Sequence, residues 1–525
     1  MKNKFVVLSF VVSGIWLNGA AAFGGAFFNV RDYGATGDSQ TLDSPAINKA
    51  IDAAAASGGG TVLVPAGTYL SGSIRLKSNI HLLIDAGATI LGAPQEMNAY
   101  DETEPYTSGG YQDGGHSFFH NSLIWGENLT NVFITGHGMI NGGGLISKEK
   151  TGIMDRMIGF TGDALPAFPP GETSGMPPVR IGNKAIALKL CRNVVVRDIT
   201  IFRGGHFAIL ATGCDGMTVD NVTMDTSRDG IDVDCCRNVT ISNCRVNTPV
   251  DDGICLKSTY ALGEVRLTED VTIVNCQLSA FPVGTLVYNL PRPAWSANSW
   301  CNGRIKLGTE SSGGFRNIVI ANCIFRHSLG LALEQVDGGI MENISISNLT
   351  MTEIPDYGIY ITTGNRNRTP NLTTASRARN INISNVIIDG TGPMSGIQIM
   401  GLPEQPLEGI RLENIRLISR GGGTQADAAI VPPELGSNYP EPRQLGTLPA
   451  YGIFARHVRD LELANIRVSY EKEDLRPAIV CTDVDGLEID NFKAQVAPGV
   501  VAARFDDVKR LIIRNSPVLD GAPGR

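Results

Sequence analysis

The sequence predicts an all-β protein folded as a right-handed parallel β-helix, a solenoid with a short capping helix near its N-terminus. Three observations predict it: a ten-residue unit with paired Asn positions recurs, a Gly-opened segment recurs between its copies, and Gly is abundant at 61 of 525 residues. Repeated short strands joined by tight turns favour a solenoid over a helical bundle. Because a solenoid lengthens without thickening its core, so long a chain need not divide into globular domains.

The chain begins with a segment typical of a secretory signal. A basic start and an apolar stretch from Phe5 to Trp16 precede three alanines at 20–22, which offer a cleavage site. The stretch is too short to span a bilayer, and no later segment is long and apolar enough. We therefore predict a signal peptide over residues 1–22, export to the periplasm or the cell exterior, and one β-helix domain over residues 23–525.

The recurring unit reads x-N-φ-x-φ-x-N-φ-x-φ, where φ is apolar. Alternation with a period of two predicts a strand with one buried face. Asn suits the bends because it tolerates left-handed backbone. Clear copies begin at Arg192, Arg237, Glu269, Arg316, Glu342, Arg379 and Glu408, and weaker ones at Leu461, Leu487 and Leu511.

The second segment, usually opened by Gly, also alternates. Its copies begin at Gly230, Gly253, Gly303, Gly330, Gly358 and Gly396. Together the two segments predict one turn of a β-helix every 22 to 26 residues where no loop intervenes, with adjacent coils about 4.8 Å apart. A leucine-rich repeat is the main alternative, but its L-x-x-L-x-L frame is missing from the sequence.

One helix is predicted near the start of the chain. Ser44 can cap it, Pro45 suits its first position, and the "SGGG" from Ser57 ends it. Ile47, Ala50, Ile51 and Ala54 are spaced along one apolar face. Such a helix covers the open end of a solenoid, as capping elements must.

Longer insertions interrupt the coils at roughly 141–183, 279–302, 364–378 and 420–450. They are rich in Gly, Pro, Ser and Thr, so we expect loops rather than separate domains. Loops on a rigid scaffold usually carry binding functions, and we expect these to wall a cleft. If the loops at 141–183 and 420–450 close that cleft, exo action is favoured.

The ten cysteines predict stacked core positions. Cys191, Cys214 and Cys236 precede "RN" or "DG" pairs at offsets of 23 and 22 residues, and three others follow Asn in "NC". Such regular placement is typical of small apolar residues stacked in a core. A disulfide framework is the alternative in an exported protein. A metal site is not indicated, because no pair has CxxC spacing.

Charge excludes one class of partner. The net charge is −8 and no basic block occurs in the sequence. Nucleic-acid binding depends on clustered Lys and Arg. We therefore expect no nucleic-acid partner.

Carboxylates recur at one position of two successive coils. Asp229 and Asp252 each precede the Gly that opens a strand, 23 residues apart, and Asp251 lies beside them. Three carboxylates so close cannot all ionise cheaply, and glycoside hydrolysis needs one protonated carboxyl and one carboxylate. An exposed acidic turn or a calcium site are the alternatives. Asp232 and Asp234 alternate along the strand and are predicted to be surface ladder residues.

Three segments resemble glycoside hydrolase family 28, the polygalacturonases and rhamnogalacturonases of the pectin-lyase-like superfamily. They are "FNVRDYGATGD" from Phe28, "DGIDVD…VDDGICLKS" from Asp229 and "GTESSGGFRNI" from Gly308. The resemblance implies that Asp251 is the general acid, while Asp229 and Asp252 hold and deprotonate the attacking water. It also implies inversion at the anomeric carbon, with carboxyls about 6.5–9.5 Å apart, and no metal or cofactor.

The sequence departs from the family at three motifs. The family's "NTD" reads Ser227-Arg228-Asp229, which places a cation beside the acids. Its "SHG" reads Asn302-Gly303-Arg304, without the histidine. Its "RIK" should fall one coil later, where the Arg and Lys positions read Ala332 and Glu334.

We expect several charged side chains near the aspartates to bind an acidic sugar, because a carboxylate needs a cationic or multi-donor partner. The predicted substrate-binding residues are Arg228, Lys257, Arg304, Lys306, Glu310, Glu334 and His206. The alternative for Lys257 and Lys306 is an external ladder position paired with Asp or Glu.

The resemblance implies an inverting hydrolase, acting as a monomer on a pectic polysaccharide or oligosaccharide that contains galacturonate or rhamnogalacturonate. One alternative is a polysaccharide lyase whose aspartates hold calcium and whose base is Arg228 or Arg304. Another is a non-catalytic carbohydrate-binding β-helix or adhesin. The changed motifs favour a variant pectic specificity over that of an ordinary polygalacturonase.

Overall fold

The computed structural model describes residues 27–105, 116, 118–146, 180–292, 294, 301–371, 374–392 and 394–522. The predicted signal peptide and most of the insertion at 141–183 lie outside the described residues. No helix in the described ranges is long and apolar enough to cross a membrane.

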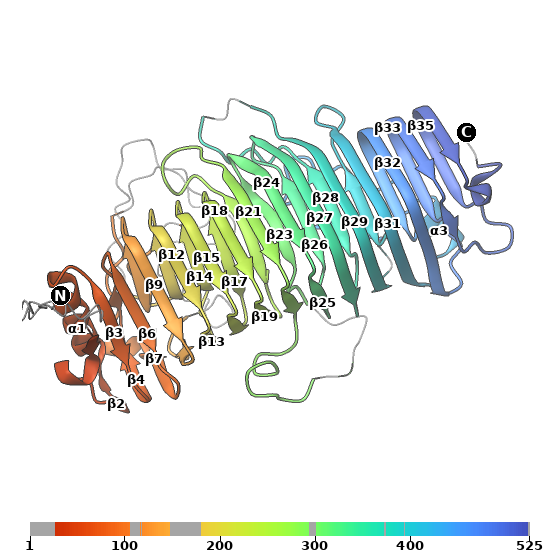
Figure 1. Ribbon diagram of the computed structural model, residues 1–525. Coiled ribbons are helices and arrows are strands. Elements are labelled where there is room, and N and C mark those ends of the chain that lie inside the picture. The colour runs from red at the N-terminus through yellow and green to blue at the C-terminus, as the bar shows by residue number, and fades with distance from the viewer. Residues whose placement is uncertain are drawn as a thin grey trace, which may run out of the picture.

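The chain winds into a parallel β-helix whose coils stack along the length of the molecule (Figure 1). A typical coil has three strands, and each pairs in parallel with its equivalent on the next coil. The strands thus form three sheets, which we call first, second and third in the order in which a coil passes through them. This confirms the fold that the repeat predicts.

The first sheet contains β5 (Ile74–Arg75), β8 (Ile124–Glu127), β11 (Lys184–Lys189), β14 (Phe207–Thr212), β17 (Asp229–Asp234), β20 (Ile254–Ser258), β23 (Ile305–Ser311), β26 (Leu331–Gln335), β28 (Ile359–Thr363) and β30 (Ile397–Met400). The second contains β1 (Phe27–Asn29), β3 (Gly60–Val64), β6 (Ile80–Ile84), β9 (Thr130–Gly136), β12 (Arg192–Arg197), β15 (Asp215–Asp220), β18 (Arg237–Ser242), β21 (Thr268–Val274) and β24 (Gly314–Ala321). The third contains β2 (Asp38–Leu42), β4 (Gly67–Ser71), β7 (Ala88–Gly92), β10 (Met139–Asn141), β13 (Thr200–Phe202), β16 (Thr223–Asp225), β19 (Arg245–Asn247), β22 (Gln277–Ser279), β25 (Ile324–Arg326) and β34 (Lys493–Ala494).

Toward the C-terminus single long strands bend from one sheet into the next. They are β27 (Ile340–Thr352), β29 (Arg377–Thr391), β31 (Leu407–Gly421), β32 (Ile453–Lys472), β33 (Ile479–Asp490) and β35 (Ala503–Arg514). The repeated Asn makes these bends, as at Asn348, Asn385 and Asn414, where φ lies between 54° and 57°. Their amides also form a ladder along the molecule: Asn385 donates to Asn348, and Asn414 donates to Asn385.

The inward side chains of the three sheets form one continuous apolar core. All ten cysteines lie within the described residues, and all are buried and free of disulfides. In one stack the backbone N–H of Cys214 donates to Sγ of Cys236 at 3.2 Å. The stacking prediction is therefore confirmed, and the disulfide alternative is wrong.

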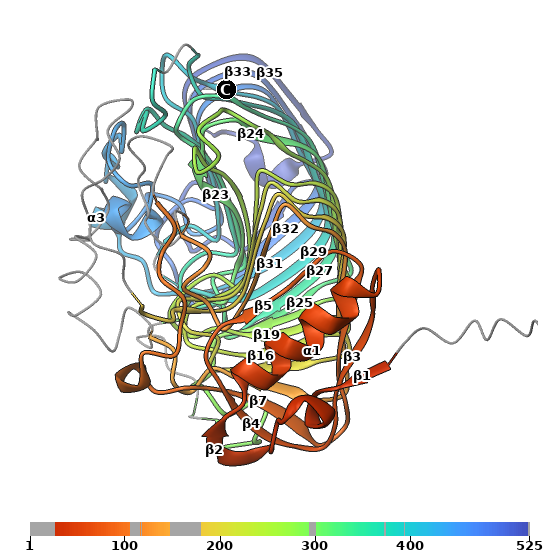
Figure 2. The same ribbon diagram turned by 90° about the vertical axis from the view of Figure 1, so that its left-hand side faces the viewer.

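The predicted helix is α1 (Ser44–Ala56), which lies across the N-terminal end of the solenoid (Figure 2). Ile47, Ala50, Ile51 and Ala54 are buried, as the spacing predicts. The N-cap is Asp43 rather than Ser44, and its carboxylate accepts the backbone N–H groups of Thr36 and Gly37 at 2.7 and 3.0 Å instead of capping the helix. The other helices within the described ranges are short: η1 (Val30–Tyr33), η2 (Gln95–Met97), α3 (Gln425–Ala428), η5 (Pro442–Leu445) and η6 (Pro517–Leu519).

Candidate active site

Three aspartates meet where the chain turns from the third sheet into the first. Because Ile231 pairs with Ile254, Asp229 lies level with Asp252 on the next coil. Gly230 permits this approach, because a Cβ there would lie 2.4 Å from the carbonyl oxygen of Gly253. With Asp251 included, one oxygen from each carboxylate lies within 4.8 Å of the others. The repeat register therefore predicted the cluster correctly.

The three carboxylates differ in burial. Asp229 and Asp252 are 3% and 1% exposed, whereas the side chain of Asp251 is 25% exposed. Asp251 is thus the member of the cluster that a bound molecule reaches most readily. These oxygens approach one another more closely than the roughly 6.5–9.5 Å typical of inverting carboxyl pairs. The prediction of inversion therefore rests on the family resemblance and not on this spacing.

Two buried cations hold Asp252 as a carboxylate. Nε of Arg304 lies 2.6 Å from Oδ1, and Nζ of Lys306 lies 3.3 Å from Oδ2. Burial opposes ionisation, but the charges of Arg304 and Lys306 outweigh it and lower the pKa of Asp252 to about 2. Asp252 is therefore ionised and cannot serve as a proton donor at neutral pH.

Asp229 has the opposite tendency. Burial and the neighbouring charges of Asp251 and Asp232 raise its pKa well above the ordinary value, and the opposing effect of Lys257 and Arg228 does not cancel them. The two aspartates level with one another on adjacent coils thus have pKa values driven apart by their surroundings. That arrangement is typical of acid–base sites.

Arg228 bridges the other two acids. Its Nη2 lies 2.6 Å from Oδ2 of Asp251 and 3.5 Å from Oδ2 of Asp229, and its side chain is 12% exposed. Three carboxylate oxygens spaced in this way could hold a metal ion. Protein cations already occupy two of the carboxylates, however, because Asp251 contacts Arg228, and Asp252 contacts Arg304 and Lys306.

Arg304 and Lys306 make further contacts away from the aspartates. Nη1 of Arg304 donates to the hydroxyl of Tyr357 at 2.6 Å, and Lys306 donates to the hydroxyl of Tyr439 at 3.3 Å. In register, Lys306 pairs with Ala332 of the following coil. This confirms that Ala332 lies one coil after Lys306, while the placement of the family's "RIK" on that later coil stays a prediction.

The insertion at 420–450 lies against these cations, as expected for a cleft wall. The ring of Tyr439 is 5.7 Å from Nζ of Lys306 and 5.8 Å from the guanidinium carbon of Arg366. Glu441 lies 3.7 Å from Arg304. The repeat pattern could not identify Tyr439 or Glu441, because an insertion has no register to count from. Tyr357 does lie in the repeat, directly before Gly358 and three coils beyond Asp252, but no acidic residue drew attention to it.

A chain of buried charges runs along the first sheet beside the cluster. Lys257 lies 3.1 Å from Glu310 and 3.7 Å from Asp232, and His116 lies 3.3 Å from Asp232. Arg366 in turn lies 3.4 Å from Glu310. On three successive strands of this sheet an acid, a base and an acid thus alternate, namely Asp232, Lys257 and Glu310.

Two predictions about these coils are wrong. Asp232 and Asp234 are both fully buried rather than on the surface. Asp234 accepts the backbone N–H and the hydroxyl of Thr259, at 2.8 and 2.6 Å. The external-ladder alternative is also wrong for Lys257 and Lys306, which are 6% and 2% exposed, although their predicted pairing with acids is correct. Loops cover this part of the first sheet, so its outward side chains are not solvated.

The remaining predicted binding residues lie at different depths. Glu334 is fully buried, accepts the hydroxyl of Thr309 at 2.9 Å and lies 3.8 Å from Nζ of Lys306. Glu310 is likewise buried. Phe207 pairs with Asp229 in register, so His206 lies on the preceding coil, with its ring edge-on to Phe207 at 4.5 Å. That His206 contacts substrate stays a prediction.

Comparisons with known proteins agree with this architecture. Residues 27–255, which include all three aspartates, match a family model described as rhamnogalacturonase A/epimerase, pectate lyase-like. A probable polygalacturonase of Vitis vinifera is 23% identical over 405 residues, covering 74% of this chain and 73% of the relative. The chain is thus similar to pectin-lyase-like proteins of the glycoside hydrolase family 28 type.

Two further similarities define how far this likeness extends. An exo-poly-alpha-D-galacturonosidase of Dickeya chrysanthemi is 24% identical over 418 residues, and the match covers 71% of this chain and 64% of that relative. The family 28 exopolygalacturonase of Yersinia enterocolitica superposes with a TM-score of 0.60 at 18% identity, over 93% of this chain and 78% of that one. The latter likeness shows the parallel β-helix fold.

Proposed function

We propose that the chain is a glycoside hydrolase that cleaves pectic polysaccharides or oligosaccharides containing galacturonate or rhamnogalacturonate. The observation that carries this proposal is the unequal state of three adjacent aspartates. Asp252 is held as a carboxylate, while the surroundings of Asp229 favour a retained proton. Hydrolysis of a glycosidic bond needs one group of each kind. The match to the rhamnogalacturonase-type family model over residues 27–255 supports it.

In the proposed resting state Asp229 and Asp251 share one proton. Asp229 is the more buried of the two, and Asp251 lies against the guanidinium of Arg228. The proton therefore resides on Asp229, and Asp251 is the charged member of the pair. Asp229 releases this proton less readily than an isolated carboxyl, because burial and the neighbouring charge of Asp251 raise its pKa.

Substrate binding moves this proton to the acid that reaches the leaving oxygen. A uronate carboxylate competes with Asp251 for Arg228, because guanidinium binds carboxylates as a planar fork. Without its cation, Asp251 takes the proton from Asp229. It then protonates the glycosidic oxygen as the bond to the anomeric carbon breaks.

The second half of the step returns the site to its starting state. A water held between Asp229 and Asp252 attacks the anomeric carbon and gives its proton to Asp229. Asp251 is left as a carboxylate beside Arg228, and Asp229 again carries the proton. Asp252 keeps its charge throughout, stabilised by Arg304 and Lys306.

The surroundings of Arg304 argue against a lyase that uses this residue as its base. β-Elimination by an Arg base needs an unprotonated guanidinium. Burial opposes the charge on Arg304, but Asp252 and its other acidic neighbours outweigh it and hold the pKa of Arg304 well above the ordinary value. Arg304 is thus a poor base here. A protein that only binds carbohydrate would make no use of the unequal protonation of the three aspartates.

The testing experiment uses purified protein with homogalacturonan, rhamnogalacturonan and their oligosaccharides. Reducing ends, product mass and ultraviolet absorbance are recorded with and without a chelator. We expect chelator-resistant release of saturated products, and we expect Asp251→Asn to abolish it without loss of fold. Absorbing products or chelator sensitivity indicate a lyase, and binding without any product indicates a carbohydrate-binding protein. The predicted export signal at 1–22 belongs to the same proposal, since pectic polymers lie outside the cell.

A further inference from the structure

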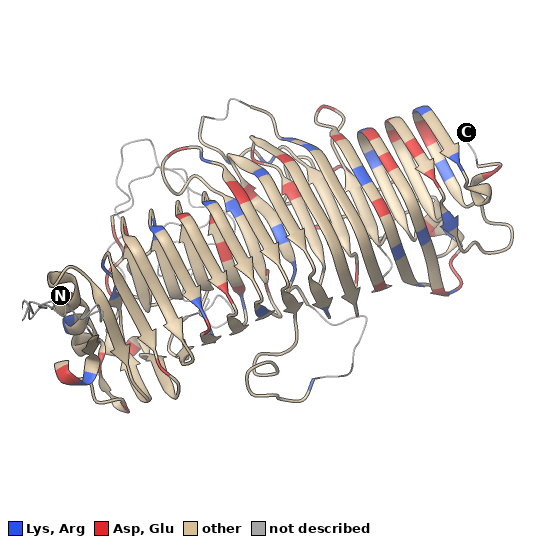
Figure 3. Cartoon of the chain, in the orientation of Figure 1, with Lys and Arg blue, Asp and Glu red and all other residues tan. Residues whose placement is uncertain are grey.

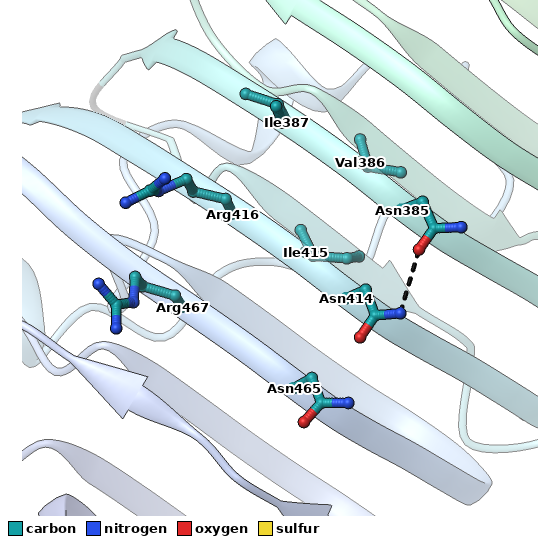
Figure 4. A pocket seen from close by; sticks show the side chains of 8 residues that line it. All are labelled: Asn385, Val386, Ile387, Asn414, Ile415, Arg416, Asn465 and Arg467. Atoms are coloured by element: carbon teal, nitrogen blue, oxygen red, sulfur yellow. Dashed lines mark hydrogen bonds between the residues drawn. The ribbon is translucent and has the colours of Figure 1, made fainter.

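A groove of about 650 Å³ lies on the third sheet, away from the aspartates (Figure 4). It spans the outer surface of three successive strands, β29, β31 and β32. Its lining residues are Asn385, Val386, Ile387, Asn414, Ile415, Arg416, Asn465 and Arg467. The two arginines extend outward along one edge, and the Asn side chains form the other (Figure 4).

The arginines belong to a row of cations on consecutive coils. Arg416 pairs in register with Arg467, and Arg467 pairs with Lys493. Equivalent positions on stacked strands lie about 4.8 Å apart, so three positive charges follow one another at that interval. Like charges directly opposite one another on neighbouring strands are destabilising. A row of this kind therefore favours a bound anion.

Several other surface cations of these coils contact acids, whereas this row does not. On the second sheet Arg411 contacts Glu413 and Glu462, and Arg510 contacts Asp485. Figure 3 shows such opposite charges side by side near the C-terminal end. Within the described part of the chain, no ion pair is formed by Arg416, Arg467 or Lys493.

Two exposed apolar side chains lie on the same row nearer the N-terminus. Ile387, which pairs with Arg416, is 46% exposed. Thr350 lies on the coil before it, and Ile324, 49% exposed, lies on the coil before that. An elongated ligand that lies along the molecular axis meets apolar side chains first and cations next. Sugar rings with charged substituents offer both kinds of contact, an apolar ring face and a carboxylate.

We propose that this groove binds a strand of anionic polysaccharide as a second site, separate from the aspartate cluster. Its occupant is a polyuronate, because evenly spaced cations match a polymer with one carboxylate on each repeating unit. The chain's net charge of −8 and its lack of a basic block argue against nucleic acid. Arg416 lies on the coil of β30, four coils beyond that of Asp252, which places the two sites about 20 Å apart along the axis.

The test compares Arg416→Ala/Arg467→Ala with Arg411→Ala, which removes a paired arginine from the adjacent sheet. Affinity electrophoresis in gels containing polygalacturonate, at low and high salt, measures polymer binding. We expect the double variant to bind about 5–10-fold more weakly at low salt and the control to bind like the unmodified protein, because each lost contact reduces salt-dependent attraction. Activity on short oligosaccharides should be unchanged in both variants, since neither touches the aspartates.

Equal polymer binding by the double variant and the unmodified protein overturns the proposal. So does an equal loss in Arg411→Ala, which indicates general charge attraction. If the double variant binds the polymer like the unmodified protein but sediments differently, the groove is a contact between copies of this chain. Because electrophoresis does not depend on hydrolysis, the result stands even if the aspartates prove not to be catalytic.

Discussion

Nη2 of Arg228 lies 2.6 Å from the carboxylate of Asp251, where the family pattern has an uncharged residue at the position of Arg228. One cation thus holds the exposed acid of the cluster and also lies 3.5 Å from Asp229. In the proposed mechanism this contact links substrate recognition to the position of the transferred proton. The proposal thereby gives Arg228 the binding of an acidic sugar that the family assigns to a motif missing here.

Arg228→Gln should lower kcat/KM on uronate oligosaccharides by about 100-fold, because a charge-assisted pair to the sugar carboxylate is lost. Arg228 also lowers the pKa of Asp229, so its removal raises that pKa further. The alkaline limb of kcat/KM against pH should therefore move to higher pH. Arg237→Gln, which removes a half-exposed arginine paired with Glu269, is the control and should leave both quantities unchanged. An unaltered pH profile in Arg228→Gln contradicts the shared-proton account.

Asp252→Asn should destabilise the fold as well as abolish activity. It leaves Arg304 and Lys306 buried without their main carboxylate, which typically costs about 3–5 kcal/mol. Asp251→Asn removes an acid that is 25% exposed and should cost less than about 1 kcal/mol. Urea unfolding of both variants measures the difference. Equal free energies of unfolding for the two variants would show that burying Arg304 and Lys306 does not require the carboxylate of Asp252.

The carboxylate of Asp252 also predicts how the free energy of unfolding changes at low pH. The pKa of Asp252 is lowered to about 2 in the folded chain, against about 3.9 when unfolded. Its contribution of about 2 kcal/mol is thus fully present above pH 4 and is lost as the pH falls through 2. The raised pKa of Asp229 acts in the opposite sense, since its ionisation costs stability as the pH rises above 4. Urea midpoints between pH 2 and 6 should fall less steeply with acid in Asp252→Asn than in the unmodified protein.

Tyr439→Ala should change the products formed from a polymer. The ring covers Lys306 and Arg366 from the insertion at 420–450, so its loss opens that side of the cluster. We expect mainly monomers and dimers from the unmodified protein and a broader range of lengths from the variant, as measured by mass spectrometry. Tyr288→Ala, an exposed tyrosine on a different loop, is the control. An identical product range in all three proteins would show that this insertion does not limit access.

How much the sequence predicts depends on whether a residue lies in the repeat. Asp229 and Asp252 could be placed together by counting one coil, and Lys306 could be placed opposite Ala332 in the same way. Asp232 and Asp234 were misplaced, because alternation identifies an outward face but not the loops that cover it.

Residues contributed by insertions could not be predicted. Tyr439 and Glu441 contact the cations of the first sheet from a loop without periodicity, so nothing in the sequence gives their position. The raised pKa of Asp229 depends on how deeply its carboxyl is buried, which the sequence does not show. Sequence reasoning could foresee three close carboxylates, but not which of them keeps the proton.

The most direct test of the central claim follows the anomeric protons by NMR while a pectic oligosaccharide is digested, with Asp251→Asn and Asp252→Asn in parallel. The account predicts saturated products whose new reducing end first appears in the inverted configuration, and no product from either variant. Unsaturated products, or undiminished hydrolysis by Asp251→Asn, would contradict it.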